Sequence, residues 1–272
     1  MLKQCRHQKA YTMIELVFVI IVLGIIASIA SEMIAKVYDS YITQRSQHRA
    51  SIKTQLVTNQ IANRLRYAIP GTIMRRVGTA GAPESIEDTL GSAEDTYTVL
   101  QWVGSDRDSF QARNAANTLP GWSGFCDLNA STATSISTPG SNLALASNII
   151  TNLGANIANA AIFFPNDDGV ERNVTGVAGT TITLDNAAPR IVERYKLAWS
   201  SYALSVEGGD LFLYHHFLPA KGIAVGGTRT LLLKNVVNFK FQGAGDTIRI
   251  KLCAQEDTGA GMVNSCKEKA IF

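Results

Sequence analysis

The chain has 272 residues, of which 46% are hydrophobic, and its 25 lysines and arginines nearly balance its 22 aspartates and glutamates. About 200 residues follow the first 70, which is enough to bury the core of one domain. Loss of residues 1–10 would remove three cations and leave 22 charges of each sign. The composition therefore excludes a strongly basic or strongly acidic protein, and the net charge singles out no partner.

Residues 11–30 form an almost continuous apolar stretch that contains a single acidic residue, Glu15. As a helix, these 20 residues would extend about 30 Å, the thickness of the hydrocarbon core of a bilayer. An unpaired carboxylate inside such a span costs about 2.5–3.5 kcal/mol on insertion scales. We therefore expect a membrane-spanning helix in which Glu15 needs a partner.

The residues around the start of this stretch form a processing motif. A short basic leader ends at the small residue Ala10, and the aromatic Tyr11 and Thr-Met-Ile-Glu-Leu follow. This arrangement resembles the N-terminal motif of type IV pilins and type II secretion pseudopilins, although that family usually has Gly and Phe at the two cleavage positions. The resemblance implies that a prepilin peptidase removes residues 1–10, cutting between Ala10 and Tyr11, and that the new amine of Tyr11 is methylated. It also implies that Glu15 pairs with the terminal amine of a neighbouring subunit, where low dielectric strengthens the attraction.

Two other interpretations of the N-terminus stay open. Ser28-Ile29-Ala30 is a passable cleavage site for an ordinary secretory signal peptide, and the stretch could also be a plain membrane anchor. However, Glu15 interrupts the apolar run, and the helical pattern continues past Ala30 without a turn. Both observations favour pilin-like processing.

A single long helix is predicted for residues 11–69, because the chain has neither Gly nor Pro between Gly24 and Pro70. These 59 residues would extend about 88 Å, and Pro70-Gly71 would end the helix. After the span, apolar residues recur at helical spacing at Met33, Ile34, Val37, Tyr38, Tyr41, Ile42, Ile52, Leu56, Ile61, Leu65 and Ala68. We expect the second half of the helix to lay this stripe on a globular head outside the membrane.

Charge is distributed unevenly after the span. Residues 33–83 hold basic residues against Asp39 alone, and residues 84–110 hold mainly acidic residues against Arg107. The basic positions are Lys36, Arg45, Arg49, Lys53, Arg64, Arg66, Arg75 and Arg76. We interpret them as a solvated face that the acidic segment partly neutralises, with subunit contacts, DNA or anionic lipid as alternatives. Aromatic residues are not interleaved with them, as a stacking platform for nucleic acid would require.

The rest of the chain is predicted to form an antiparallel β-sheet packed against the long helix, so the fold class is α+β. Strands are expected at 96–103, 169–175, 180–184, 194–206, 211–217, 228–233, 236–241 and 247–252. The turn Glu207-Gly208-Gly209-Asp210 indicates a β-hairpin, whereas residues 113–160 are predicted to be rich in loops. The long helix and the last two strands are similar to J-type minor pseudopilins and W-type minor pilins.

Cys253 and Cys266 flank a segment rich in glycine and polar residues, which is the kind of loop that a disulfide closes. Such a bond would contribute about 3 kcal/mol, and it resembles the C-terminal disulfide loop of many pilins. Zinc is disfavoured because neither residue belongs to a C-x-x-C pair. Cys5 lies in the leader. Cys126 is expected to be a buried free thiol, although pairing with another cysteine stays open.

The sequence contains no nucleotide-binding loop, so the energy for assembly would have to come from a separate ATPase. No cofactor, no metal and no enzymatic activity are expected. Residues 121–125 only approximate a nucleophile elbow, because Phe125 replaces its second glycine, and they are interpreted as a turn. His215 and His216 are expected to point to opposite faces of a strand, where they cannot readily share a metal. Residues 166–169 lack the alternating ligands of a calcium loop and are also interpreted as a turn.

The resemblance and the span predict a single-pass protein of the bacterial inner membrane with its head in the periplasm. It would then enter a type II secretion pseudopilus or a type IV pilus as a structural, minor subunit. The expected partners are a prepilin peptidase, other pilin or pseudopilin subunits, membrane lipid before assembly, and an assembly platform with a separate ATPase. The alternative is a pilus-tip or competence module whose head recognises DNA, a surface or a secreted substrate.

Overall fold

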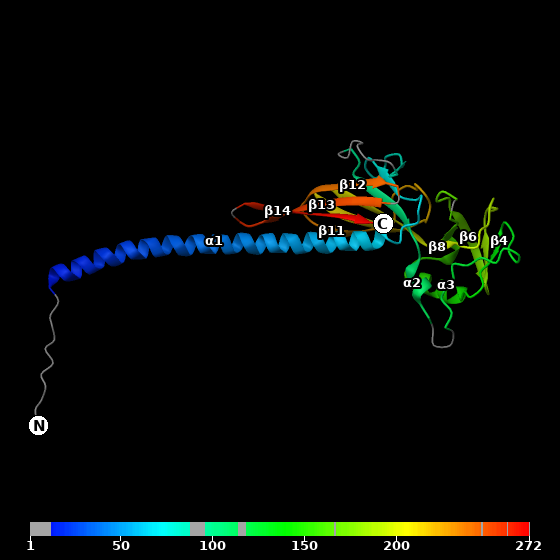
Figure 1. The fold of residues 1–272 in the computed structure, drawn as a ribbon, viewed down its shortest axis with the longest axis horizontal. Helices are drawn as coiled ribbons and strands as arrows, with labels where there is room; N and C mark the ends of the chain where they lie inside the picture. The colour runs from blue at the N-terminus through cyan, green and yellow to red at the C-terminus, as the bar shows by residue number, and fades with distance from the viewer. Residues whose placement is uncertain are drawn as a thin grey trace, which may run out of the picture.

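The protein is α+β: one long helix carries a β-rich head at its C-terminal end (Figure 1). The structure is a computed structural model. It describes residues 12–87, 96–113, 118–165, 167–245, 247–259 and 261–271. The expected fold class is confirmed.

Helix α1 (Met13–Leu65) is the long helix that the lack of Gly and Pro predicts. Its most apolar 18-residue window has a mean hydropathy of 2.8, and no other part of the described chain covers it. That helix is long and apolar enough to cross a membrane. The α-helical geometry ends at Leu65, four residues before the predicted end, and the chain then turns towards Pro70 and Gly71.

The second half of α1 packs on the head through one face, but that face is not the whole predicted stripe. The buried residues of α1 are Ala50, Thr54, Val57, Thr58, Ile61, Ala62 and Leu65. Ile61 and Leu65 are in the core as expected, whereas Ile52 and Leu56 are about half exposed at 49% and 53%. The prediction was wrong for these two residues because small and threonine side chains, rather than large apolar ones, occupy the contact face around position 54.

A six-stranded antiparallel sheet forms the centre of the head, in the order β11-β10-β9-β3-β1-β2. Its strands are β1 (Met74–Arg76), β2 (Glu84–Ser85), β3 (Val99–Gly104), β9 (Ser200–Glu207), β10 (Asp210–Phe217) and β11 (Thr228–Leu233). Strands β9 and β10 pair with Glu207 opposite Asp210, and both Gly208 and Gly209 between them have positive φ. The predicted hairpin is confirmed, since only glycine adopts this geometry without cost.

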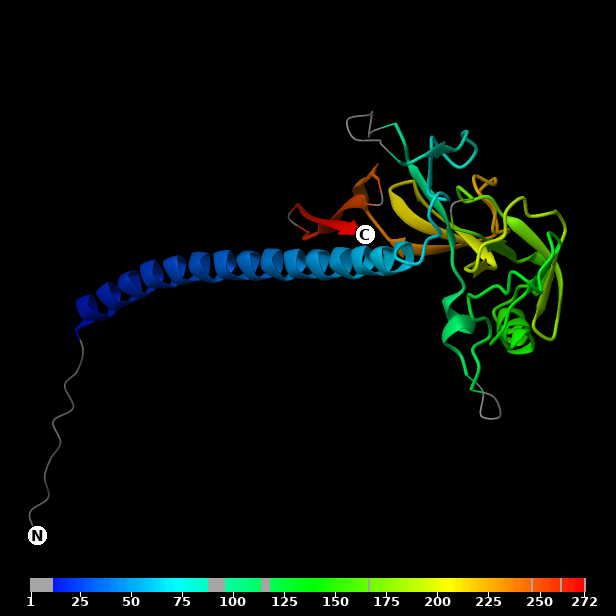
Figure 2. The same ribbon diagram turned by 45° about the vertical axis from the view of Figure 1, so that its right-hand side comes forward.

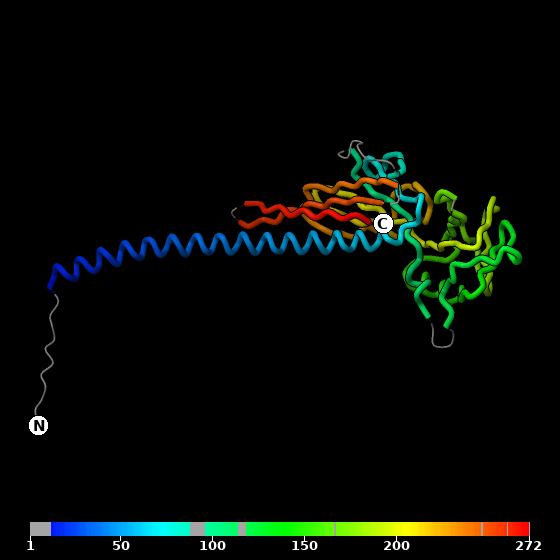
Figure 3. The backbone as a smooth tube through the Cα atoms, in the orientation of Figure 1, coloured from blue at the N-terminus to red at the C-terminus, as the bar shows by residue number. Residues whose placement is uncertain are grey.

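A second, three-stranded antiparallel sheet follows in the order β12-β13-β14. Its strands are β12 (Val236–Ala244), β13 (Thr247–Asp257) and β14 (Met262–Ile271). Strands β13 and β14 contact α1, and Figure 3 shows this hairpin running beside the helix. The two sheets and α1 enclose one hydrophobic core. It includes Ile61, Leu65, Leu100, Trp102, Leu204, Leu211, Phe239, Phe241, Ile250 and Leu252.

Beyond the end of α1 lies a second lobe with its own core (Figure 2). It holds a five-stranded sheet in the order β4-β7-β6-β5-β8. Its elements are β4 (Ser135–Ser137), α3 (Leu143–Asn152), the 3-10 helix η1 (Ile157–Asn159), β5 (Ala161–Phe163), β6 (Arg172–Ala178), β7 (Thr181–Leu184) and β8 (Lys196–Ala198). The first lobe comprises the other two sheets and the second half of α1.

The expectation of a loop-rich segment at 113–160 is therefore wrong in part. Helix α3 buries Leu143, Ala146 and Ile150 on one face, and the side chain of Asn142 caps it by accepting a hydrogen bond from Leu145 N. The cap and the apolar spacing are both visible in the sequence. The segment was nevertheless predicted to be rich in loops because its overall composition is rich in Asn, Ala and Ser.

The two lobes meet through close backbone packing. Gly71 has a φ of +75°, and a Cβ there would lie 2.9 Å from the carbonyl carbon of Asp168. A Cβ on Gly169 would likewise lie 2.7 Å from the carbonyl carbon of Gly71. Glycine is required at both positions because the chain just after α1 touches the second lobe backbone to backbone.

Candidate functional sites: the N-terminal segment and the inter-lobe cleft

The N-terminal segment presents Glu15 in the first turn of α1. The N–H of Glu15 donates to the carbonyl oxygen of Thr12 at 3.1 Å, and the side chain is exposed on the free half of the helix. An acidic residue at this position interacts favourably with the positive end of the helix dipole. The predicted processing residues Ala10 and Tyr11 lie outside the described residues.

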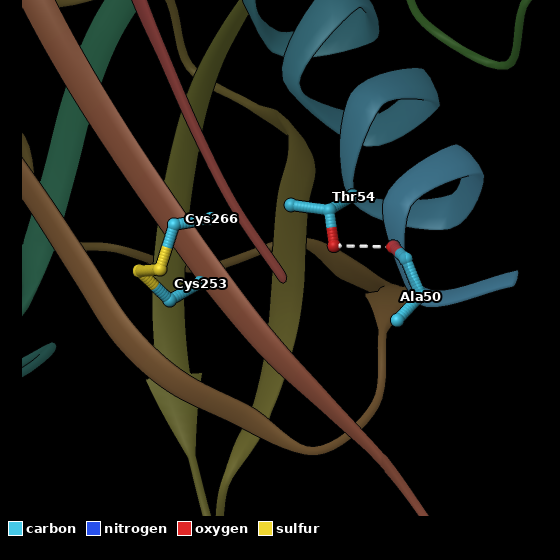
Figure 4. The surroundings of a disulfide bond; sticks show 4 residues. All are labelled: Ala50, Thr54, Cys253 and Cys266. Carbon is cyan, nitrogen blue, oxygen red and sulfur yellow. Dashed lines mark hydrogen bonds between the residues drawn. A yellow bond between two sulfur atoms is a disulfide. The ribbon is translucent and has the colours of Figure 1, made fainter. Parts of the chain in front are cut away.

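The disulfide between Cys253 and Cys266 joins neighbouring strands rather than the ends of a loop (Figure 4). The two residues lie directly opposite each other in the β13–β14 pairing, and Met262–Ile271 is a strand that the sequence analysis did not predict. Thr54 of α1 lies near this bond, and its hydroxyl donates to the carbonyl oxygen of Ala50 at 2.8 Å. The disulfide therefore fastens the hairpin that covers the helix.

The basic positions of residues 33–83 do not form one surface. Arg75 and Arg76 are only 6% and 4% exposed. Arg75 forms a salt bridge with Glu84 at 3.1 Å, so the acidic segment does partly neutralise the basic one. Arg76 donates to the side-chain oxygen of Gln101 at 2.7 Å and to the backbone carbonyl oxygens of Gly222 and Ile223. These two arginines stabilise the head from within and are not available to a ligand.

A large hollow of the head lies where the two lobes meet, beside the end of α1. It has a volume of about 470 Å³, and we call it the inter-lobe cleft. Its lining comes from separate parts of the chain. They are residues 66–67 just after α1, the short helix α2 (Arg107–Gln111) with the residues before it, and, in the second lobe, segments 122–125 and 194–196 with Pro165. No single stretch of sequence reveals it.

Four cations line the inter-lobe cleft: Arg66, Arg107, Arg194 and Lys196. All four are exposed, and within the described residues none of them forms a salt bridge. The guanidinium carbon of Arg107 lies 4.4 Å from the ring centroid of Tyr67. The surrounding protein partly desolvates the Lys196 ammonium and lowers its pKa, although the side chain is still exposed. The cleft thus gathers positive charge that the described protein does not neutralise.

Aromatic side chains form the walls and floor of the same cleft. Phe110 and Trp122 lie with their ring centroids 4.8 Å apart, and Trp122 lies 5.7 Å from Tyr195. Arg194 lies over the ring of Phe125, 5.3 Å from its centroid. Trp122 and Tyr195 are buried, whereas Phe110 and Phe125 are 43% and 51% exposed. Two large rings are therefore open to solvent beside the unpaired cations.

Asp106 holds this arrangement in place. One of its carboxylate oxygens accepts a hydrogen bond from Ser109 N at 3.1 Å and so caps α2, which carries Arg107 and Phe110. Its carbonyl oxygen accepts a hydrogen bond from the indole N–H of Trp122 at 2.9 Å. Asp106 is 2% exposed, and burial raises the pKa of its carboxyl.

A second hollow of about 390 Å³ continues the cleft along α1, because it shares Tyr67 and residues 105–107 with it. It adds Arg64, whose guanidinium carbon lies 5.6 Å from the ring centroid of Tyr202. Within the described residues Arg64 also has no salt bridge. The continuous surface therefore carries five cations, and the exposed acidic residue on its lining is Asp108.

Comparison with known proteins bears on the N-terminal segment. Residues 5–31 match the model of the prokaryotic N-terminal methylation motif. The chain carries this motif. No curated protein and no solved structure matches the chain.

The methylation motif is typical of type IV pilins and pseudopilins, and it supports a pilin-like structural subunit. The motif implies processing by a prepilin peptidase and assembly with other pilins. The free apolar half of α1 fits membrane anchoring and assembly into a filament. The motif covers about a tenth of the chain.

The two histidines of β10 do not point apart, so that prediction was wrong. A bulge interrupts the β9–β10 pairing between Tyr214 and Phe217, and His216 has a φ of +60°. The ring of His216 therefore turns back onto that of His215, with centroids 4.5 Å apart and the two Nδ1 atoms in contact. Strand alternation holds only where the pleat is regular.

Residues 121–125 form an irregular turn, as expected, and they contribute Trp122 and Phe125 to the cleft. In the 166–169 segment, where Asn166 lies outside the described residues, the carboxylate of Asp167 pairs with Arg172 at 2.7 Å. The carboxylate of Asp168 lies 3.4 Å from Lys221. Cys126 is buried and free, and burial raises the pKa of its thiol.

Proposed function

We propose that this protein is a minor structural subunit of a type II secretion pseudopilus or a type IV pilus. The observation that carries the proposal is the coincidence of the methylation motif at residues 5–31 with a helix whose first half touches nothing else in the described chain. A long apolar surface left uncovered in a monomer needs lipid or other subunits to cover it. Membrane lipid would cover this surface before assembly, and other subunits would cover it in the proposed filament.

In this proposal the chain divides into three parts. Residues 1–10 are a leader that a prepilin peptidase removes between Ala10 and Tyr11, after which Tyr11 is methylated. Residues 11–30 span the inner membrane within the long helix, and residues 71–272 form the periplasmic head. The platform protein and a separate ATPase drive assembly, because the sequence contains no nucleotide-binding motif. The protein acts as a structural component and not as an enzyme.

The placement of Glu15 supports the assembly role that we propose for it. Its carboxylate is exposed on the free half of α1, near the N-terminus of the processed chain. In the apolar interior of a filament, the methylated amine of a neighbouring Tyr11 would neutralise it, and the pair would set the register between subunits. We propose a minor subunit because the head carries a second lobe beyond the end of α1, which favours a specialised position over a uniform repeat.

Mass analysis of the N-terminus of the exported protein tests the processing. The expected N-terminal residue is N-methylated Tyr11, and in a strain that lacks the prepilin peptidase the same chain keeps residues 1–10. A mature protein that starts at Ser31 would show signal-peptide cleavage and overturn the proposal. Retention of residues 1–10 in the presence of the peptidase would overturn it too.

The head is a candidate binding module in the same filament, because the inter-lobe cleft exposes unpaired cations. Charge reversal separates the two roles only at exposed positions. Arg64→Glu with Arg66→Glu changes the cleft surface, whereas reversal of the buried Arg75 or Arg76 would disrupt the head itself. Normal secretion or piliation together with lost ligand binding would assign binding to the head.

A further inference from the structure

We propose that the inter-lobe cleft binds single-stranded nucleic acid, with the backbone phosphates on its arginines and the bases stacked on its exposed rings. The proposal does not depend on the filament role, since it concerns a surface at the far end of α1 from the methylation motif. Its test uses the isolated full-length chain, so failure of either proposal leaves the other intact.

The charge of the cleft favours a polyanionic ligand. Arg64, Arg66, Arg107, Arg194 and Lys196 line one continuous surface, and among the described residues none has an acidic partner. By contrast, Arg229 in β11, an exposed arginine that also lies over an aromatic ring, pairs with Glu207 at 2.8 Å. Cations left unpaired around a concave surface favour a ligand that carries several negative charges.

The guanidinium groups are also held in position. Arg107, Arg194 and Arg64 each lie over an aromatic ring, 4.4, 5.3 and 5.6 Å from its centroid. A cation–π contact with a ring favours one placement of the guanidinium, and its N–H groups remain able to donate to phosphate oxygens. Less side-chain entropy is lost when such a prearranged donor binds its ligand.

The exposed rings select the kind of anion. Tyr67, Phe110 and Phe125 are 38%, 43% and 51% exposed, and all three line the cleft among the cations. Proteins that bind single strands combine a positive groove with aromatic side chains on which bases stack. A duplex keeps its bases stacked on one another and offers no free base to these rings. An acidic peptide would use the cations and leave the exposed surface of the rings uncovered.

In the cleft, aromatic residues do lie among the cations. Tyr67 follows Arg66 in the chain, Phe110 lies one turn from Arg107 on α2, and Phe125 meets Arg194 from a distant segment. The interleaving is spatial, and it includes Arg107, Arg194 and Lys196, which lie outside the basic stretch at 33–83.

Fluorescence anisotropy tests the binding, with the full-length chain in detergent and a labelled oligothymidylate of about 12 nucleotides, within the usual site size. We expect binding at low salt that weakens with added salt. If about four phosphates are neutralised, the slope of log K against log salt is about −3. Absence of binding at low salt would overturn the proposal.

Point variants locate the site. Arg107→Ala, Arg194→Ala and Phe125→Ala should each weaken binding roughly tenfold, and each arginine variant should reduce the salt slope by about 0.7. The matched controls are Arg229→Ala and Leu231→Ala in β11, which remove an exposed arginine over a ring and an exposed apolar residue away from the cleft. They should bind as the parent does, and equal weakening in controls and cleft variants would contradict the assignment.

Competition identifies the ligand class. Unlabelled oligothymidylate should displace the probe at least tenfold better than a duplex or a poly-glutamate peptide of the same charge. Equal displacement of the probe by poly-glutamate would show that the cleft binds anions without regard to their bases. Equal displacement by the duplex would show that base stacking on the rings does not contribute to binding. Either result overturns the proposal. Thermal unfolding of every variant checks that the head remains folded.

Discussion

Lys53 of α1 donates to both carboxylate oxygens of Glu256 in β13, at 2.8 and 2.9 Å, across 203 residues of sequence. On the next strand, Lys269 of β14 donates to the side-chain oxygen of Asn59 at 2.9 Å. These polar contacts lie at the edge of the interface between α1 and the β13–β14 hairpin. The apolar contacts beneath them contribute most of the stability, because partly exposed ion pairs typically contribute less than about 1 kcal/mol.

The helix–head contact predicts a contrast between two apolar residues of α1. Ile61→Ala should lower the free energy of unfolding by about 2–4 kcal/mol, because Ile61 is 1% exposed in the first-lobe core. Leu56→Ala is the matched control and should change it by less than about 0.5 kcal/mol, since Leu56 is 53% exposed. Urea denaturation of the full-length chain in detergent measures both. Similar losses for the two variants would contradict the observed helix face.

Removal of the disulfide should destabilise the head. The double variant Cys253→Ala with Cys266→Ala should lose about 3 kcal/mol of unfolding free energy, because the bond restrains the unfolded chain over a separation of 13 residues. Protease cleavage within the hairpin β13–β14 should also become faster than in the parent. A chain with Cys126→Ala and the bond intact is the control for the loss of a thiol. If reducing agent left the unfolding midpoint of the parent unchanged, the stabilising role would be wrong.

Replacement of Glu15 should separate membrane insertion from assembly. Glu15→Leu removes a charge from the apolar half of α1, so insertion should be unchanged or better, while incorporation into filaments should fall at least tenfold. Glu32→Leu is the matched control, because Glu32 lies further along the same helix, where it pairs with Lys36 at 2.7 Å. Quantification of sheared or cross-linked filaments measures incorporation. Normal incorporation of Glu15→Leu would rule out the pairing with a neighbouring amine.

Stability should fall on acidification because of His215. Burial first, and then the charges of His216 and Arg64, lower the pKa of His215 below its usual value of 6.5. The unfolded chain therefore binds a proton more readily, so this contribution is complete above about pH 6.5 and is lost as the pH falls below that value.

Geometry adds to this effect. His215 Nε2 contacts the hydroxyl of Thr230 in β11, and His216 Nε2 donates to the carbonyl oxygen of Leu153 at the end of α3. Two protonated rings would bring two N–H donors together where the Nδ1 atoms meet. Denaturation at pH 7.5 and 5.5 should show a smaller pH effect in His215→Gln than in the parent. His48→Gln, in an exposed position on α1, should keep the parental pH effect.

The parts that could be predicted from the sequence are those whose signal is local. The long helix follows from an uninterrupted run without Gly or Pro, and the β9–β10 hairpin follows from Gly208-Gly209 between two apolar segments. Strand β14 was missed because polar or charged residues occur on both of its faces. The sequence of this strand therefore shows no apolar periodicity. Pairing with β13 and contact with α1 determine it instead.

The inter-lobe cleft could not be predicted from the sequence because its residues are distant from one another along the chain. Arg66, Arg107 and Arg194 are separated by 41 and 87 positions, and only the packing of the two lobes brings them to one surface. The contact between His215 and His216 likewise depends on a β-bulge, which the two-residue alternation of a regular strand does not predict. Electrostatic and aromatic features that arise from tertiary packing have no signature in a linear motif.

The length of α1 has a consequence for what can reach the cleft. If residues 11–30 span the bilayer as proposed, about 35 further helical residues, or about 50 Å of helix, separate the span from Arg66. Electrostatic attraction in physiological salt decays over about 8 Å. Anionic lipid headgroups are therefore too distant to occupy the arginines of the cleft, which stay available to molecules arriving from solution.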